Sequence, residues 1–246
     1  MINDTHNRPA INLLELIQLF DNSIPQLSID CVIFGFKDGE LKVLLCKNTG
    51  VDLWALQGGY IGQDEDIDVA ARRTLKERTG LTDIFLKQYH TFGKANRPTF
   101  AFLKQLLEKD NIDIENYPFL KQRFVSIGYY SLVDFQKVTP TAGQFFERSE
   151  WFDIQNLPNL VFDHAEMIEK ALETMRHSLD YHLVGFNLMP ETFTMKDIQR
   201  LYETILGTPL RRNTFQEKML NLNILERLEK QYSGGAHKAP YLYRFK

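Results

Sequence analysis

The stretch from Gly59 to Leu81 constrains the fold more than any other part of this 246-residue chain. It opens as a glycine-containing loop and continues into a segment whose apolar residues recur at helical spacing, so a helix is expected after the loop. Acidic residues crowd the helix start, where the macrodipole favours negative charge, and Gly80 stands where a left-handed C-terminal cap is needed. The residues expected to pack inward are Ile67, Ala70 and Ala71.

The spacing resembles the Nudix signature, in which Gly, five residues, Glu and seven residues precede Arg-Glu-apolar-x-Glu-Glu-x-Gly-apolar. Two positions depart from it, because Thr74 and Arg78 stand where the first and last carboxylates of the core belong. Helix positions 74, 77 and 78 share one face, so an intact signature directs three carboxylates at Mg²⁺. The positions that carry the resemblance or its departures are Gly59, Glu65, Arg73, Thr74, Glu77, Arg78 and Gly80.

On this chain the same face offers a hydroxyl, one carboxylate and a guanidinium, and a cation at the metal's position opposes metal binding. Glu77 is expected to pair with Arg73 one turn back, which is a structural role. The resemblance therefore implies the Nudix fold without its hydrolytic chemistry. No catalytic residue, metal or cofactor is expected, and the sequence contains no P-loop, His-Glu-x-x-His or Gly-x-Ser-x-Gly pattern.

Bulk properties place the chain among globular proteins of ordinary composition, with enough length for one large domain or two modest ones. No apolar run approaches a membrane-spanning length and residues 1–9 lack a signal-peptide pattern, so we expect a cytoplasmic protein with no membrane partner. Cys31 and Cys46 fall within apolar, strand-like runs, which favours buried thiols over a disulfide or a metal pair.

Several segments around the signature indicate strands. Leu27–Phe36 and Leu41–Lys47 are apolar, β-branched runs joined through Asp38-Gly39, which is a strong hairpin signal. Residues 83–95 and 124–135 also have strand-like patterns. Residues 103–117 are predicted to be an exposed insertion, and residues 134–147 a loop.

Helices complete the domain. Asp163 is expected to cap a helix that ends near Leu179, with Glu166 completing a capping box. The order of elements predicts an α/β fold, a Nudix-like α/β/α sandwich that binds an effector, over residues 23–180. Before it, Ile11–Phe20 has an amphipathic helical pattern. This N-terminal helical arm, residues 1–22, fits a core helix as well as a dimerisation element.

Residues 181–246 differ from the rest of the chain in net charge and in the pattern of predicted elements. They contain ten Lys or Arg and six Asp or Glu, whereas residues 1–180 contain 19 and 26, so the tail suits an anionic partner. Thr194, with Asp197, can cap a helix 195–206, and a break at 207–209 leads to a second helix near 212–222. Strand-like runs at 225–232 and 241–245 follow, with a glycine-containing turn between them. Helix, turn, helix and β-hairpin are the outline of a winged helix-turn-helix DNA-binding domain, although a helical cap domain has a similar pattern.

The second helix would place its leading side chains at base edges in the major groove, and Arg, Asn and Gln have suitable donor and acceptor geometry. Basic residues of the wing, Lys230, His237, Lys238 and Arg244, are candidates for phosphate contacts. The candidate DNA-binding residues are Arg211, Arg212, Asn213, Thr214, Gln216, Lys218 and Lys238.

The pairing of a degenerate Nudix signature with the strings Leu-Met-Pro-Glu-Thr-Phe-Thr-Met-Lys-Asp and Arg-Arg-Asn-Thr-Phe-Gln-Glu-Lys-Met-Leu resembles the Nudix-related transcriptional regulators of the NrtR family. The resemblance implies a homodimer whose winged helices bind a palindromic, double-stranded operator and whose Nudix-like domains sense a small molecule. Some members sense ADP-ribose. This chain is most similar to the sugar-responsive AraR-type branch, which implies L-arabinose as the effector and sugar-catabolic genes as targets.

Three functions are compared. A Nudix hydrolase is disfavoured by Thr74 and Arg78. A nucleotide-sensing regulator stays open, because Arg78 is able to hold a phosphate without a metal. A sugar-sensing regulator, the main prediction, needs only a pocket with a few buried polar groups. Candidate effector-binding residues are polar side chains within strands or loops, although a water-facing strand edge explains them equally well: Asp30, Lys47, Gln57 and Glu147.

Overall fold

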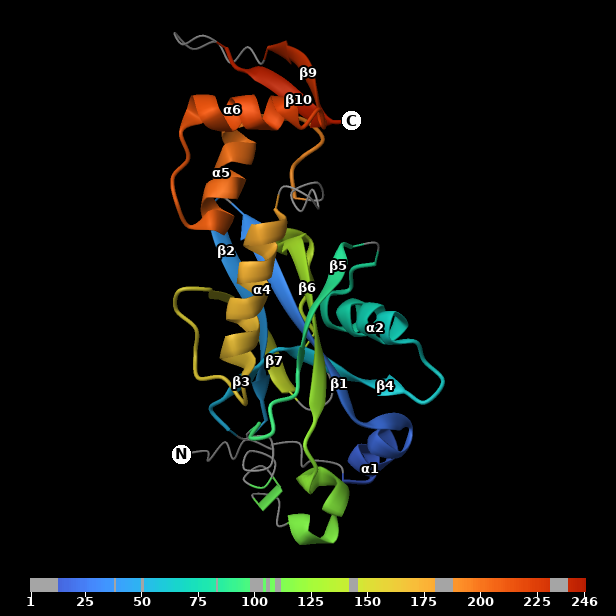
Figure 1. Cartoon of the computed structure of the whole chain (residues 1–246). Coiled ribbons are helices and arrows are strands. Elements are labelled where there is room, and N and C mark those ends of the chain that lie inside the picture. Colours follow the sequence, from blue (N-terminus) through green and yellow to red (C-terminus); the bar gives the residue numbers. More distant parts are fainter. Residues whose placement is uncertain are drawn as a thin grey trace, which may run out of the picture.

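The computed structural model describes residues 13–37, 39–49, 51–82, 84–97, 104, 107–108, 112–141, 146–179, 188–230 and 239–246. Figure 1 shows an elongated molecule, in which a β-sheet with helices on both faces forms the larger part and a smaller domain sits at one end. The boundary predicted at residues 180/181 lies outside the described ranges. None of the described helices is both long and apolar enough to cross a membrane.

Within the described ranges, seven strands form one mixed sheet, with the order β3-β2-β1-β6-β5 and with β4 paired to β1 and β7 to β2. Its central strand β1 runs parallel to β6, from the pair Leu27–Val125 to the pair Phe36–Asp134, and antiparallel to β2 and β4. The strands are β1 (Ser23–Lys37), β2 (Glu40–Asn48), β3 (Trp54–Ala55), β4 (Gln57–Gly62), β5 (Leu86–Phe92), β6 (Val125–Asp134) and β7 (Phe146–Asp153).

The predicted hairpin of β1 and β2 is confirmed, since Phe34 pairs with Val43 in antiparallel register and Gly39 adopts a φ of 84° at the turn. A positive φ of this size suits glycine, because a side chain would be strained there. The strands predicted at 83–95 and 124–135 are present as the shorter β5 and β6.

The two faces of β1 belong to different cores, because successive side chains of a strand point to opposite sides. Ile29, Cys31 and Ile33 pack with the buried residues of α2 (Ile67–Thr79). Val32 and Phe34 belong to a second core that includes the buried residues of α4 (His164–Ser178). In Figure 1, α2 and α4 accordingly cover opposite faces of the sheet. The α/β/α sandwich predicted from the sequence is confirmed.

The signature helix is close to its prediction. Gly80 has a φ of 73° and donates its N–H to Lys76 O, as a left-handed C-cap does. Ala70 and Ala71 are fully buried, but the prediction that Ile67 packs inward is wrong, because its exposed fraction is 39%. Ile67 is the first residue of the helix, where no preceding turn holds it against the sheet.

The far end of the molecule from the smaller domain holds α1 (Leu13–Asp21) and two short 3₁₀ helices, η1 (Ile114–Asn116) and η2 (Pro118–Lys121). The Phe20 ring lies 5.0–5.8 Å from the rings of Tyr60, Phe119 and Phe124, so the end of α1 packs on the body. Within the predicted exposed insertion, Leu107 is 2% exposed and packs with Leu120, so that prediction is wrong at this point.

Two predictions around α4 are also wrong. The segment predicted as a loop contains η3 (Phe135–Lys137) and the start of β7, which pairs with β2 from Asn48–Phe146 to Lys42–Asp153. Asp163 precedes α4 but makes no capping hydrogen bond. Its carboxylate is instead held by Arg97, as described below.

The smaller domain follows its prediction closely. β8 (Phe193–Thr194), α5 (Met195–Leu206), α6 (Arg212–Asn221), β9 (Leu225–Lys230) and β10 (Tyr241–Phe245) occur in that order, and the three strands pair as β8-β10-β9. Thr194 and Asp197 form the predicted capping box, and Gly207 ends α5 with a φ of 72°. Phe215 and Met219 of α6 are buried, so the remaining side chains of this helix face outward.

Candidate effector site and DNA-binding surface

Four residues of the Nudix-like segment form one network of hydrogen bonds and ion pairs around Arg73, which we call the signature frame: Tyr60, Glu65, Arg73 and Glu77. Arg73 donates from Nε to Glu65 Oε1 and from Nη2 to Glu65 Oε2, both at 2.8 Å, and also to Tyr60 O. Glu65 in turn accepts the N–H of Gly62, and Arg73 reaches Glu77 at 3.4 Å, as predicted. The hydrogen bonds from Arg73 lower the pKa of Glu65. These bonds tie β4 and the loop that follows it to α2. Figure 1 shows this loop between β4 and α2.

The two positions at which this chain lacks the metal-binding carboxylates of the signature, Thr74 and Arg78, make other contacts. Thr74 is fully buried, and a Cβ added at Gly59 would lie 2.6 Å from Thr74 Oγ1, so the helix packs directly on β4. The prediction that the signature opens as a loop is wrong at Gly59, which pairs with Ile29 within the sheet. Arg78 sends Nη2 toward Gly58 O at 3.4 Å, and its guanidinium lies 5.9 Å from the centre of the Phe146 ring. Within the described ranges, no group of three His, Cys, Asp or Glu residues is placed to hold a metal ion. A magnesium ion of the Nudix type does not fit this arrangement.

Polar side chains gather on the α2 face of the sheet instead. Gln57 pairs with Cys31, whose side chain belongs to the α2 core, and its Nε2 lies 3.4 Å from Ser149 Oγ. Gln57 Oε1 and Thr74 Oγ1 are buried, and neither atom makes a hydrogen bond with any described residue. Buried polar atoms are almost always satisfied, so these two are suited to meet a ligand or a water. We call Gln57, Thr74, Arg78 and Ser149 the α2-side polar group.

Burial also controls the two thiols on this face. Desolvation raises the pKa of Cys46 to about 12 and raises the pKa of Cys31 further, while the charge of Arg78 lowers both slightly. Both cysteines are free and buried, as predicted. Neither thiol is therefore ionised near neutral pH, and neither is suited to act as a nucleophile or metal ligand.

The α4 face of β1 holds a second polar cluster, the Asp30 cluster, consisting of Asp30, Arg97, Ser126, Asp163 and His164. Asp30 is 8% exposed, so the water-facing alternative is wrong for it. It accepts a hydrogen bond from Ser126 and lies 3.7 Å from His164 Nε2 and 3.9 Å from Arg97 Nη2. Arg97 holds both oxygens of Asp163 at 2.9 Å from Nε. Desolvation lowers the pKa of His164, whose Nδ1 accepts the N–H of Leu56 at 2.9 Å.

The structure does not bring the four predicted effector residues together. Asp30 and Gln57 are neighbours in register but face opposite cores of the sheet. Lys47 forms an ion pair with the exposed Asp52 at 2.8 Å, and Glu147 is an exposed residue of β7 beside Arg148. Sequence reasoning missed Arg97, Ser126 and Ser149, because each gains its role only through a partner at least 66 residues away.

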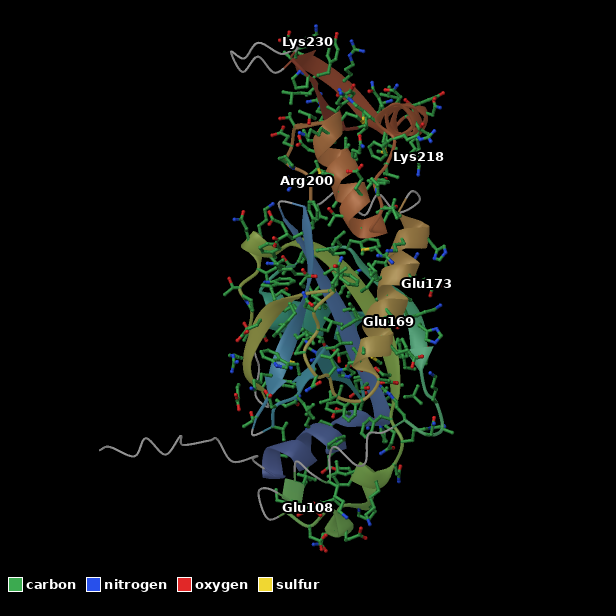
Figure 2. The ribbon with its side chains drawn as sticks, turned by 90° about the vertical axis from the view of Figure 1, so that its left-hand side faces the viewer. Glu108, Glu169, Glu173, Arg200, Lys218 and Lys230 are labelled. Atoms are coloured by element: carbon green, nitrogen blue, oxygen red, sulfur yellow. The ribbon has the colours of Figure 1, made fainter. Side chains whose placement is uncertain are left out.

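The outward face of α6 carries the predicted DNA-binding side chains. Arg211, Arg212, Asn213, Thr214 and Lys218 are exposed, and Gln216 is partly buried. Lys238 and His237 lie outside the described residues. In Figure 2, Lys218 and Lys230 lie at the end of the molecule away from the large sheet. Lys230 and Arg227 both stack on Tyr241 in the wing, whereas Arg244 pairs with Glu226. The surface combines cations and amide groups, as base and phosphate recognition requires.

Two family models match the chain in the order of its domains. Residues 24–171 match the NUDIX domain, and residues 185–245 match the NrtR DNA-binding winged helix domain. Together with the exposed basic face of α6, this combination defines the class, a ligand-responsive, DNA-binding transcriptional regulator. The chain belongs to the Nudix family and has the domain organisation of the NrtR regulators.

Individual relatives agree with this. The ADPR responsive transcriptional repressor NtrR of Acinetobacter baylyi is 28% identical over 235 residues, which cover 93% of this chain and 85% of the relative. The crystal structure of Shewanella oneidensis NrtR complexed with a 27mer DNA superimposes with a TM-score of 0.68 at 25% identity, covering 90% and 94% of the two chains. A MutT/nudix family protein from Enterococcus faecalis shares the fold, with a TM-score of 0.65 at 19% identity over 95% and 93%.

Proposed function

We propose that this regulator senses a nucleotide of the ADP-ribose class, that it does so without a metal ion, and that it does not hydrolyse the ligand. The observation that carries the proposal is the replacement of two carboxylates by Thr74 and Arg78 within an otherwise intact Nudix frame. A hydrolase needs Mg²⁺ to activate water, and a sensor needs only to bind. A guanidinium forms charge-assisted hydrogen bonds with phosphate oxygens, so Arg78 replaces the attraction that a metal ion would supply.

The effector class rests on the relative from Acinetobacter baylyi, whose name describes it as ADPR responsive. The L-arabinose prediction gains no support from the comparisons. The α2-side polar group also suits a nucleotide better than a sugar, because it combines a cation with neutral polar atoms that have unused hydrogen-bonding capacity. Lys47 and Glu147, both outside this group, stay predicted contacts that require a larger ligand to reach the edge of the sheet.

Regulation then works as a shift between two states of a homodimer. Two recognition helices about 34 Å apart match half-sites one helical turn apart on a palindromic operator. A ligand in the Nudix-like domain changes operator affinity only to the extent that it binds the two states unequally. The dimer itself is part of the proposal, as are the cytoplasmic location and the role of residues 1–22 as its arm.

Thermal unfolding of the purified chain with ADP-ribose, NAD or L-arabinose, each with and without Mg²⁺, tests the proposal. A ligand that binds only the folded state raises the midpoint according to RT ln(1 + [L]/Kd). We expect ADP-ribose to raise it equally with and without Mg²⁺. Arg78→Gln should abolish most of this shift, whereas the matched control Arg72→Gln, at an exposed position of the same helix, should keep it.

The alternative outcomes are distinct. A shift that requires Mg²⁺, or release of phosphate products, would contradict the sensor assignment and support hydrolysis. A shift with L-arabinose alone would overturn the nucleotide and restore the sugar. The Asp30 cluster would then become the candidate site, because carboxylate, guanidinium and imidazole groups suit sugar hydroxyls.

A further inference from the structure

The last turn of α5 is held by the C-terminal end of α4. Arg176 donates from Nε to Ile205 O at 2.8 Å, and its Nη2 lies 3.3 Å from the position of a Cβ at Gly207. Ile205 O is one of the carbonyls that the end of a helix leaves without a partner. A cation at a helix C-terminus is also favoured by the macrodipole, so Arg176 binds this turn by charge and by hydrogen bond.

The same turn is held from a second side by the hairpin of β1 and β2. Thr204 Oγ1 lies 3.1 Å from Gly39 O and 2.8 Å from Arg200 O of its own helix. The Arg200 side chain lies directly against Gly39, where an added Cβ would be 2.3 Å from Arg200 Nε. Figure 2 shows Arg200 at the junction between α5 and the upper end of the hairpin. We call Gly39, Arg176, Thr204 and Ile205 the α5 clamp.

The clamped turn is also bonded to the connection that leads into the recognition helix. Glu203 accepts the N–H of Leu210 at 2.8 Å and a hydrogen bond from Gln199 at 2.9 Å, and Gln199 also donates to Leu210 O. The ring of Tyr202 packs edge-on against Phe215 of α6, with centroids 5.1 Å apart. These bonds and this ring contact join the end of α5, the connection and α6.

The two elements that form the clamp both begin in the effector domain. β1 carries Asp30 and passes between the α2-side polar group and the Asp30 cluster before it reaches the hairpin at Gly39. α4 starts at His164 in the Asp30 cluster and reaches Arg176 in its last turn. Figure 1 shows β1 and α4 running from the body of the sheet toward α5, so a ligand that displaced either element would displace the clamp as well.

We propose that the α5 clamp couples the effector domain to the recognition helix, with Arg176 and Thr204 as its positioning residues. The inference rests on the proposed function, because it requires that effector binding changes operator binding. It does not depend on which effector binds. Coupling between two sites is reciprocal, so DNA bound at α6 must in turn affect the hairpin and α4.

Amide hydrogen exchange with and without DNA tests the clamp without any effector. The probe is the tightest duplex selected by the protein from a random-sequence library. In the unmodified chain, DNA should slow exchange in α6, in α5 and also in the hairpin and the C-terminal half of α4. In Arg176→Met/Thr204→Val, the slowing should stop within the winged helix domain. Glu169→Met, an exposed substitution on α4, should retain the full spread.

Operator affinity measured with and without ADP-ribose provides the second readout. We expect the unmodified chain to change affinity within the range of about 5–150-fold that is typical of allosteric coupling, and the double variant to change it less than about twofold. Both proteins should bind ADP-ribose equally, which a purely destabilising change would not preserve.

The proposal is contradicted if DNA slows exchange in the unmodified chain only within the winged helix domain, or if the double variant still shows slowing in the hairpin and in α4. If ADP-ribose leaves operator affinity of the unmodified chain unchanged, the effector assignment fails instead, and the exchange experiment alone decides the clamp.

Discussion

Helices α2 and α6 both present polar side chains for binding, but they present them to different environments. On α6, Arg212, Asn213 and Lys218 are exposed. The buried residues of this helix are Phe215 and Met219, which pack it against the rest of the domain. On α2, Thr74 is completely buried, and Arg73 is bonded to Tyr60 of β4, to Glu65 of the following loop and to Glu77 of α2 itself. The proposed DNA-binding face of α6 is therefore available without rearrangement, whereas an effector at the proposed α2-side site would have to reach polar atoms inside the fold.

This difference predicts how substitutions behave. An exposed polar side chain contributes to binding and little to stability, because water replaces its contacts. A buried one contributes to stability with a sign that depends on whether it is paired, because an unpaired buried polar atom costs free energy and a paired one does not. Three predictions, in order of decreasing effect, test this distinction.

Arg73→Ala should have the largest effect and should lower the free energy of unfolding by about 2–3 kcal/mol, because it removes charge-assisted hydrogen bonds to the partly buried Glu65 carboxylate. Urea unfolding followed by circular dichroism measures it. Arg72→Ala, at an exposed position of the same helix, should change stability by less than about 0.5 kcal/mol. Equal losses for the two variants would mean that the signature frame is not what holds the loop.

The sequence predicts a structural feature well when the residues that form it are close together in the chain. Thr194 with Asp197, Gly80, Gly207 and the Gly39 hairpin were all predicted, since each acts on residues within a few positions. These features predict the winged helix almost to the residue and the C-terminal end of the signature helix at Gly80.

The predictions failed where a residue or strand has its partner far away in the sequence. Asp163 has the sequence context of a capping residue, but Arg97, 66 positions earlier, takes its carboxylate. Asp30 was expected to be paired or solvated, and its partner Ser126 lies 96 positions away on β6. Strand β7 was missed because its side chains are mostly exposed or partly buried without strict alternation, so its pairing with β2 leaves no clear pattern in the sequence.

Arg212→Ala should leave stability unchanged and weaken operator binding by about 30-fold, or about 2 kcal/mol, if Arg212 contacts a base edge. The loss of a cation from the first turn of α6 is mildly favourable for the helix itself, so the two effects have opposite signs. Fluorescence anisotropy with operator duplexes that differ at one position measures it. Lys76→Ala removes the same charge from the exposed face of α2 and should leave affinity unchanged.

The sequence dependence of that loss identifies the contact. A loss concentrated at one base pair indicates base recognition, whereas a uniform loss across duplexes, with a weaker dependence on salt, indicates a phosphate contact. Unchanged affinity for every duplex would contradict the assignment of α6 as the recognition helix.

Thr74→Val and Thr79→Val give the smallest effects and the sharpest contrast, because they make the same change at two buried positions of one helix. The Thr79 hydroxyl donates to Leu75 O at 2.7 Å and accepts the N–H of Leu81, so its removal should lower the free energy of unfolding by about 1 kcal/mol. The Thr74 hydroxyl has no hydrogen-bond partner among the described residues, so its removal should raise stability by up to about 1 kcal/mol.

If the α2-side polar group binds the effector, the stabilised Thr74→Val protein should also bind ADP-ribose less tightly, as isothermal titration calorimetry would show. Thr79→Val, whose hydroxyl is occupied within the helix, should keep its affinity despite its lower stability. A residue kept polar at a cost to the fold is then explained by the ligand. Loss of stability in both variants, with unchanged affinity, would instead mean that an ordered water satisfies Thr74 and that the ligand binds elsewhere.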